Sequence, residues 1–83
     1  MKVTVRYFAA LREALGPQDS VELPPGATLA ALRDQLLAAS PRHAQALRRG
    51  RSLRCAVDQD LADETTVLDE GAEVAFFPPV TGG

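Results

Sequence analysis

The sequence has very little of the material from which covalent staples and metal sites are built. Its 83 residues include one cysteine, Cys55, and one histidine, His43, too few for an internal disulfide or a structural zinc site. No apolar run approaches the roughly 20 residues that a membrane-spanning helix needs. The net charge of −2 lacks the positive excess that duplex binding requires. We therefore expect a cytoplasmic chain with no metal and with no nucleic-acid or membrane partner.

Motifs for catalysis are also missing. The sequence has no Walker-type phosphate loop, no carboxylate cluster with metal-binding spacing, and no nucleophile placed beside a base. Hydrophobic residues make up 46% of the chain and charged residues 24%, which is typical of a folded domain. A chain of this length has a thin core and little capacity to enclose a catalytic pocket. We expect one domain that is not an enzyme on its own and that binds no cofactor.

Two segments alternate between apolar and polar residues with the period of a β-strand. In residues 2–8 the apolar side chains share one face, except that Phe8 lies on the polar side. In residues 72–77 the alternation places Phe77 on the face opposite Phe76. Both segments are predicted to be strands with one buried face, and both Phe8 and Phe77 are predicted to lie outside the core.

The chain between these strands predicts one main helix and several shorter elements. Thr28 is suited to cap a helix whose leucines recur at helical spacing and which Pro41 is expected to end. Short strands are expected at residues 20–23 and 53–58, and a short helical turn at residues 9–15.

The resulting order of strand, strand, helix, strand, strand predicts an α+β fold, with a mixed sheet packed on one main helix. Ubiquitin-like β-grasp domains have this order. A split β-α-β arrangement would need a second long helix, and the segment between Pro41 and Leu53 is too short and broken for one. We therefore predict a β-grasp domain over residues 1–77 and an extended tail over residues 78–83.

Three polar features of the domain have ordinary structural interpretations. Cys55 alternates with apolar neighbours, so it is expected in the core rather than as a persulfide carrier. His43 is expected to be an isolated surface residue. The arginines between residues 48 and 54 are interpreted mainly as a solvated loop, with an anion contact as the alternative.

The end of the sequence has the composition of a thin, extended segment. Two prolines favour an extended conformation, and the final two glycines have no side chain. Six extended residues reach about 20 Å, enough to carry a carboxylate into a partner's active site. The residues predicted to insert are Pro78, Pro79, Val80, Thr81 and Gly82, with the reactive carboxylate on Gly83. That carboxylate must be activated, and the chain has no group for this step, so the activating enzyme must be another protein. The alternative is an ordinary frayed terminus.

Three stretches of the sequence resemble a known family. They are residues 7–13 (YFAALRE), residues 55–59 (CAVDQ) and residues 71–83, which end in FFPPVTGG. Together they are similar to the small, sulfur-carrying subunits of molybdopterin synthase. A terminal Gly-Gly alone is a weak signal because ubiquitin and the thiamine-pathway sulfur carrier share it, whereas the joined FFPPVTGG string is specific.

The resemblance implies a cycle that depends on other proteins. An adenylyltransferase similar to the ubiquitin-activating enzymes would use ATP to adenylate Gly83, and a persulfide donor would supply sulfur to form a thiocarboxylate. The tail would then enter the large subunit of molybdopterin synthase and donate its sulfur to cyclic pyranopterin monophosphate. Two small and two large subunits would form a heterotetramer, in which this chain is the non-catalytic sulfur donor.

A contact patch on the domain is predicted beside the tail. In a β-grasp sheet the first and last strands are parallel neighbours, so Phe8 and Phe77 would lie side by side, and Leu61 would complete the patch. A bulge or a covering loop would instead bury these rings. Arg12 matches an arginine of the family pattern and is expected to help bind the activating enzyme.

Three other functions are compatible with the same features. A ubiquitin-like protein modifier would form isopeptide bonds with target lysines. A sulfur carrier for thiamine synthesis or tRNA thiolation would use the same activated glycine. A plain binding module would carry the tail without using it.

Overall fold

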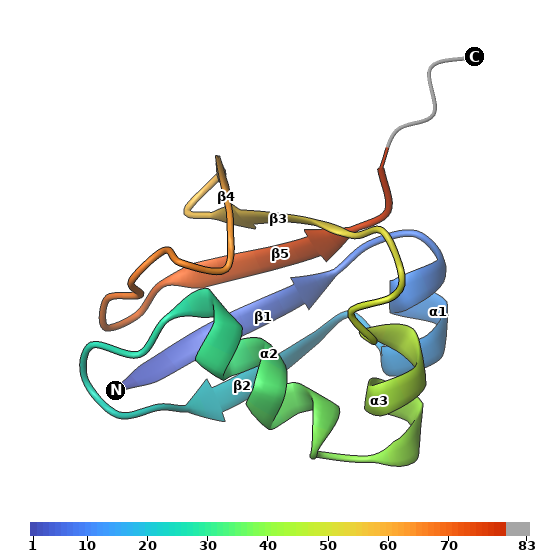
Figure 1. The fold of residues 1–83 in the computed structure, drawn as a ribbon, viewed down its shortest axis with the longest axis horizontal. Helices are drawn as coiled ribbons and strands as arrows, with labels where there is room; N and C mark the ends of the chain where they lie inside the picture. Colours follow the sequence, from blue (N-terminus) through green and yellow to red (C-terminus); the bar gives the residue numbers. More distant parts are fainter. Residues whose placement is uncertain (80–83) are drawn as a thin grey trace.

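A computed structural model describes residues 1–79 of the chain, which form a five-stranded sheet in the order β2-β1-β5-β3-β4 (Figure 1). The strands are β1 Lys2–Tyr7, β2 Gln18–Glu22, β3 Arg54–Val57, β4 Asp60–Ala62 and β5 Glu73–Phe77. The two central strands, β1 and β5, are parallel, and every other pairing is antiparallel. This confirms the mixed sheet and the neighbouring first and last strands. The predicted reactive end, residues 80–83, lies outside the described residues.

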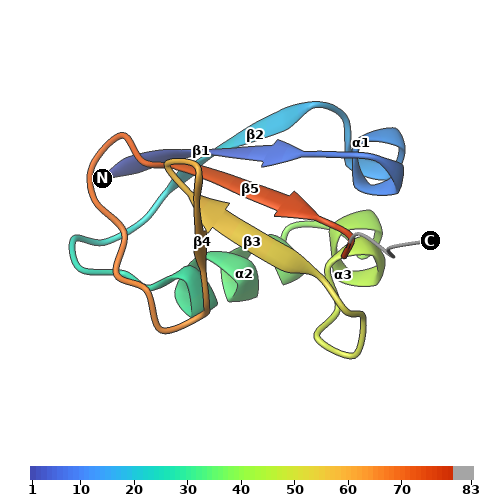
Figure 2. The ribbon, with the colours of Figure 1, turned by 90° about the horizontal axis from the view of Figure 1, so that it is seen from above.

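Three helices accompany the sheet: α1 Ala10–Leu15, α2 Leu29–Leu37 and α3 Pro41–Ala46. Helix α2 packs across one face of the sheet, and α3 continues on the same side (Figure 2). The Thr28 hydroxyl caps α2 by accepting a hydrogen bond from the Ala31 amide at 3.3 Å, as predicted. The expectation that Pro41 ends this helix is wrong. Helix α2 ends at Leu37, and Pro41 starts α3, because the first turn of a helix needs no amide donor there.

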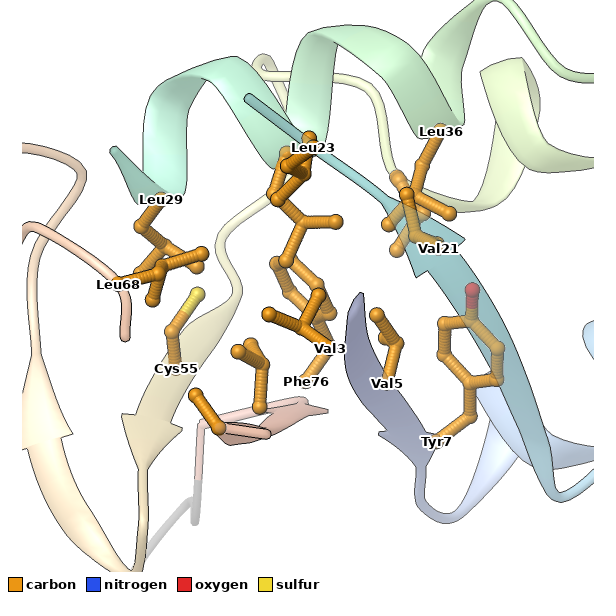
Figure 3. Close-up of a cluster of buried hydrophobic side chains, with 14 of the residues drawn as sticks. Val3, Val5, Tyr7, Val21, Leu23, Leu29, Leu36, Cys55, Leu68 and Phe76 are labelled. Atoms are coloured by element: carbon orange, nitrogen blue, oxygen red, sulfur yellow. The ribbon is translucent and has the colours of Figure 1, made fainter. Parts of the chain in front are cut away.

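The core lies between the sheet and α2 (Figure 3). Alternation along β1 and β5 directs every second side chain toward the helix, and the leucines of α2 meet them. The fully buried side chains contributed by these three elements include Val3, Val5, Tyr7, Val74, Phe76, Leu29 and Leu32. Burying each large apolar side chain stabilises the fold by about 1.5–3 kcal/mol, so this single layer of contacts is the main source of stability.

A hairpin joins β3 to β4, and strand β4 is an element that the sequence did not predict. Asp58 and Gln59 both have positive φ, 48° and 75°, as the two-residue turns that suit hairpins require. This conformation usually takes glycine, and none is present here. The Asp58 carboxylate accepts a hydrogen bond from the Glu73 amide at 3.0 Å, and the Asp58 amide donates to the Glu73 carbonyl at 2.8 Å. These bonds to β5 hold the turn in place.

His43 is not the isolated surface residue that its position in the sequence suggested. Its Nε2 lies 2.8 Å from an Asp19 carboxylate oxygen, and its Nδ1 lies 2.7 Å from the Ser40 hydroxyl. The Tyr7 hydroxyl donates to the same Asp19 oxygen at 2.8 Å. The network joins β1, β2 and α3, so His43 has a structural role that only the packing of these elements creates. Burial and the nearby Asp19 carboxylate raise the pKa of Tyr7 well above its usual value.

Candidate docking face at the root of the tail

The candidate site lies on the face of the sheet opposite α2, where β5 leads into the tail. Strands β1 and β5 end together, and the Phe8 amide donates to the Phe76 carbonyl at 3.3 Å. Because side chains alternate along a strand, Phe77 points away from the core that Phe76 fills. Ala75 pairs with Ala56 of β3, which in turn pairs with Leu61 of β4. This register brings apolar side chains from four segments onto one surface.

These side chains surround a shallow apolar hollow with a volume of about 740 Å³. Its lining residues are Phe8, Ala9, Ala56, Gln59, Leu61, Ala75, Phe77, Pro78 and Pro79. We call this set the docking face. Ala56, which is buried, and Ala75, which is half-buried, form its floor, because their short side chains leave space between the larger ones. Pro78 and Pro79 are part of the lining, so the start of the tail and the hollow form one continuous surface.

The larger side chains of the docking face remain in contact with solvent. Leu61 is 69% exposed and Phe8 is 41% exposed, whereas Phe77 is half-buried. An exposed apolar cluster of this kind is a candidate surface for binding another molecule. Arg6 lies over the Phe8 ring, 5.7 Å from its centre, and pairs with Glu73 at 3.7 Å, which gives the face a polar edge. The structure thus brings together Phe8, Leu61 and Phe77, and no bulge or loop covers them among residues 1–79.

Arg12 does not line the docking face. It lies exposed on α1, beyond the end of β1, and its side chain makes no ion pair with any residue in the described part of the chain. Its expected role in binding the activating enzyme therefore stays a prediction. The tail residues Val80, Thr81, Gly82 and Gly83 lie outside the described residues, so their predicted insertion and chemistry stay predictions as well.

Cys55 is a core residue, as the alternation predicted. Its thiol packs on the inner face of the sheet, and burial raises its pKa to about 11. The thiol is therefore protonated near neutral pH and is a poor nucleophile. Among residues 1–79, no group of three or more histidine, cysteine, aspartate and glutamate side chains could hold a metal ion. No helix in the same range is long and apolar enough to cross a membrane.

Comparison with known proteins identifies the family of the chain. The sequence profile described as the ThiS family matches residues 5–83. The chain belongs to the ThiS family. The molybdopterin synthase sulfur carrier subunit of Escherichia coli is 43% identical to it, over 98% of this chain and 99% of the relative. The protein of the same name from Mycobacterium tuberculosis is 42% identical, over 100% of this chain and 99% of the relative.

Solved structures of similar proteins share the fold of this ThiS-family chain. SAMP1 from Haloferax volcanii matches with a TM-score of 0.82 at 25% identity, over 100% of both chains. A putative molybdopterin converting factor subunit 1 from Pyrococcus furiosus matches with a TM-score of 0.80 at 28% identity, over 96% of this chain and 99% of that one. A complex of subunits 1 and 2 of molybdopterin-converting factor from Helicobacter pylori matches with a TM-score of 0.72 at 26% identity, over 100% of both chains. The predicted ubiquitin-like β-grasp fold is confirmed.

The floor of the docking face was not named from the sequence. The alternation in residues 72–77 already placed Ala75 on the same side as Phe77. Ala56, by the same reasoning, lies opposite Cys55. The sequence therefore held the signal, but small side chains do not stand out until the strand register places them between larger ones.

Proposed function

We propose that this ThiS-family chain is the sulfur carrier subunit of a molybdopterin synthase and that Gly83 carries the sulfur. The full-length similarity to subunits of that name supports the proposal. The observation that carries it is the docking face, an open apolar surface that continues into Pro78 and Pro79 at the root of the tail. The chain supplies a surface for docking and a reactive end, and the catalytic groups belong to its partners.

The proposed chemistry takes place on the terminal carboxylate. A carboxylate oxygen of Gly83 attacks the α-phosphorus of ATP in the activating adenylyltransferase, and pyrophosphate leaves. The terminal sulfur of a protein persulfide then attacks the acyl carbon, and AMP leaves. A second thiol cleaves the sulfur–sulfur bond to the donor, which leaves a thiocarboxylate on Gly83. In the large subunit this sulfur attacks cyclic pyranopterin monophosphate, and hydrolysis returns the carboxylate. Two such deliveries form a dithiolene.

The docking face has an energetic role in this cycle. Ordering six tail residues costs about 1–2 kcal/mol each, or roughly 6–12 kcal/mol in all. Burying three apolar side chains at about 1.5–3 kcal/mol each contributes roughly 4–9 kcal/mol. Contacts of Phe8, Leu61 and Phe77 would therefore offset most of the entropy lost when the tail enters a partner.

Two partners and a cytoplasmic location belong to the proposal. The large subunit of molybdopterin synthase would receive the tail, in a heterotetramer of two small and two large subunits. The complex from Helicobacter pylori supports a two-subunit assembly. An adenylyltransferase would bind the chain separately and use ATP and the persulfide donor, with Arg12 of α1 contributing to that contact.

Intact-mass analysis tests the proposal directly. The chain is incubated with the adenylyltransferase, ATP and a persulfide donor, and its mass is measured before and after. The expected gain equals the replacement of one oxygen by sulfur, and fragmentation localises it to Gly83. Chains with Gly83 deleted, or with one residue added after it, serve as matched controls and should give no active carrier while melting at the same temperature. An unchanged mass with competent enzymes, or full activity of these variants, contradicts the proposal.

A second function is supported by a different relative. Two of the similar solved structures from Haloferax volcanii are of SAMP1, named small archaeal modifier protein 1 in one of them. A protein modifier would use the same activated glycine to form an isopeptide bond with a lysine. Cells expressing a tagged form would then contain a ladder of larger species, and the ladder would disappear when Gly83 is deleted. A carrier devoted only to molybdopterin synthesis would give no ladder.

A further inference from the structure

The charged side chains are separated along the length of the sheet. The last residues of β1 and β5, the root of the tail, α1, α3 and the loop before β3 all lie at one end of the domain (Figures 1 and 2). The β3–β4 hairpin and the turn before β5 lie at the other end. The acidic residues at that far end are Asp58, Asp60, Asp69, Glu70 and Glu73. The end that carries the tail has two acidic residues, Glu13 of α1 and Asp19 of β2, but is richer in arginine.

We call three arginines at this end, Arg42, Arg51 and Arg54, the arginine cluster; of these, Arg54 borders the root of the tail. Arg54, the first residue of β3, pairs with Phe77 across the sheet and lines a small hollow together with Pro79. Arg42 of α3 and Arg51 of the following loop line a hollow of about 760 Å³ next to α1. The Arg51 guanidinium also donates to the Ala46 carbonyl at 3.4 Å, which holds it against the end of α3.

The arginine cluster differs from Arg6, Arg33 and Arg49 because no carboxylate within residues 1–79 neutralises its charges, and the same is true of Arg12 and Arg48. Arg49 donates to Asp34 at 2.6 Å and to Glu64 at 2.7 Å, and Arg33 pairs with Glu64 at 3.6 Å. By contrast, none of the three arginines of the cluster forms an ion pair within residues 1–79. From the sequence alone, the arginines between residues 48 and 54 are interpreted as one solvated loop. In the structure Arg49 forms ion pairs, whereas Arg48, Arg51 and Arg54 form none within residues 1–79.

We propose that the arginine cluster docks onto an acidic surface of the large subunit, beside the opening through which the tail enters. This inference rests on the proposed function. It goes beyond it by specifying that the surface of the large subunit around the opening is negatively charged. Opposite charges steer an encounter before contact is made and fix its orientation. Arg54 lies beside Phe77 and Pro79, and Arg42 and Arg51 lie at the same end of the domain, so attraction there would bring the tail to the opening while the apolar docking face makes contact with the partner.

The geometry favours a protein surface over RNA as the occupant. Three arginines neutralise few phosphates, and affinity for a nucleic acid grows with the number of phosphates neutralised. The chain also carries a net charge of −2, with the acidic end close to the docking face, so a long polyanion would be repelled. An acidic patch on a folded protein matches the small size of the cluster.

Association kinetics with the large subunit of the same organism test this inference. The variant R42E/R51E/R54E is compared with the wild-type chain at NaCl concentrations from low to high. We expect wild-type association to slow as salt rises, and the variant to associate about 10-fold or more slowly at low salt, with the gap closing at high salt. Lys2→Glu is the matched control, because it reverses an exposed cation at the acidic end of the domain, and it should differ less than about 2-fold from the wild type.

Each outcome bears on a different claim. If the wild-type chain binds and delivers sulfur but the triple variant associates equally fast with the same salt dependence, the arginine cluster has no docking role. If the wild-type chain receives no sulfur and does not bind, the proposed function itself fails. Tight binding of tRNA that the triple variant loses would overturn the assignment to a protein surface. Should the triple variant melt at a lower temperature, R42Q/R51Q/R54Q gives the same comparison with neutral side chains.

Discussion

Phe76 and Phe77 are consecutive residues of the same type with opposite roles. Phe76 is fully buried on the inner face of the sheet, against α2, whereas Phe77 lies half-buried on the docking face. The β-strand alternation alone separates them. The comparison shows that one short strand supplies both the stability of the domain and its binding surface, and that a substitution on one face can leave the other intact.

The largest effect on stability is expected on the inner face. Phe76→Ala should lower the free energy of unfolding by about 3–5 kcal/mol, because it removes a ring from a close-packed core and leaves a cavity. Chemical denaturation monitored by circular dichroism measures the change. A loss below about 1 kcal/mol would mean that neighbouring side chains move in to fill the cavity. The two faces of the sheet would then contribute more equally to stability than their burial indicates.

The second effect concerns Cys55, also on the inner face. Burial raises the pKa of its thiol from 9.0 to about 11, so above pH 9 the unfolded chain ionises before the folded one. The free energy of unfolding should therefore fall between about pH 9 and pH 11, by up to about 2–3 kcal/mol. Unfolding also returns the pKa of Tyr7 to its ordinary value near 10, which lies within this range, so Cys55→Ala is the control. If the wild type and this variant lose stability in parallel, the thiol is not the cause.

A smaller effect is expected at Tyr7, whose ring lies in the core and whose hydroxyl belongs to the network with Asp19 and His43. Tyr7→Phe keeps the ring in the core and removes the hydrogen bond to Asp19, which retains His43 as a partner. We expect a loss of about 1–2 kcal/mol in the free energy of unfolding. Thermal unfolding of the two proteins at pH 7 measures it. Equal stability would show that the hydrogen bond between Tyr7 and Asp19 contributes no more than the hydrogen bonds that both groups make to water in the unfolded chain.

The smallest effect on stability, and the largest on binding, is expected on the docking face. Phe77→Glu should change the free energy of unfolding by less than about 1 kcal/mol but weaken binding of the large subunit by about 10-fold or more, because a charge replaces apolar contact area. Titration calorimetry measures the binding. Val67→Glu is the matched control, since Val67 is 57% exposed and lies outside the docking face. A collapse of stability in Phe77→Glu would place the ring in the core.

Sequence reasoning was most successful where a pattern is local. Alternation separated Val3, Val5 and Tyr7 from Phe8, and the spacing of leucines identified α2 together with its cap at Thr28. It failed where the decisive contact joins distant segments. His43 was called isolated because Asp19 lies 24 residues away, and β4 was missed because its turn has no glycine.

Arg33 is another residue whose role depends on contacts between distant segments. Arg33 sits in the middle of α2, and its guanidinium donates to the Leu47 carbonyl at 2.8 Å and to the Arg48 carbonyl at 2.9 Å. It is almost fully buried, which is unusual for this residue type. No helical pattern predicts that, because its partners belong to a loop. The same loop contains Arg49, whose ion pairs with Asp34 and Glu64 distinguish it from Arg48 and Arg51, which form none within residues 1–79.

The sequence by itself determined the alternation, the helix, the glycine-ended tail and the family, because each depends on residue order over short distances. Only the tertiary structure decided that Phe8, Leu61 and Phe77 share one open surface and that Arg42, Arg51 and Arg54 lie at the end of the domain that carries the tail, with no ion pair among residues 1–79. These groupings come from strand register and from the way α1 and α3 pack at one end of the sheet. Such long-range pairing depends on the whole core, and no segment of the chain encodes it alone.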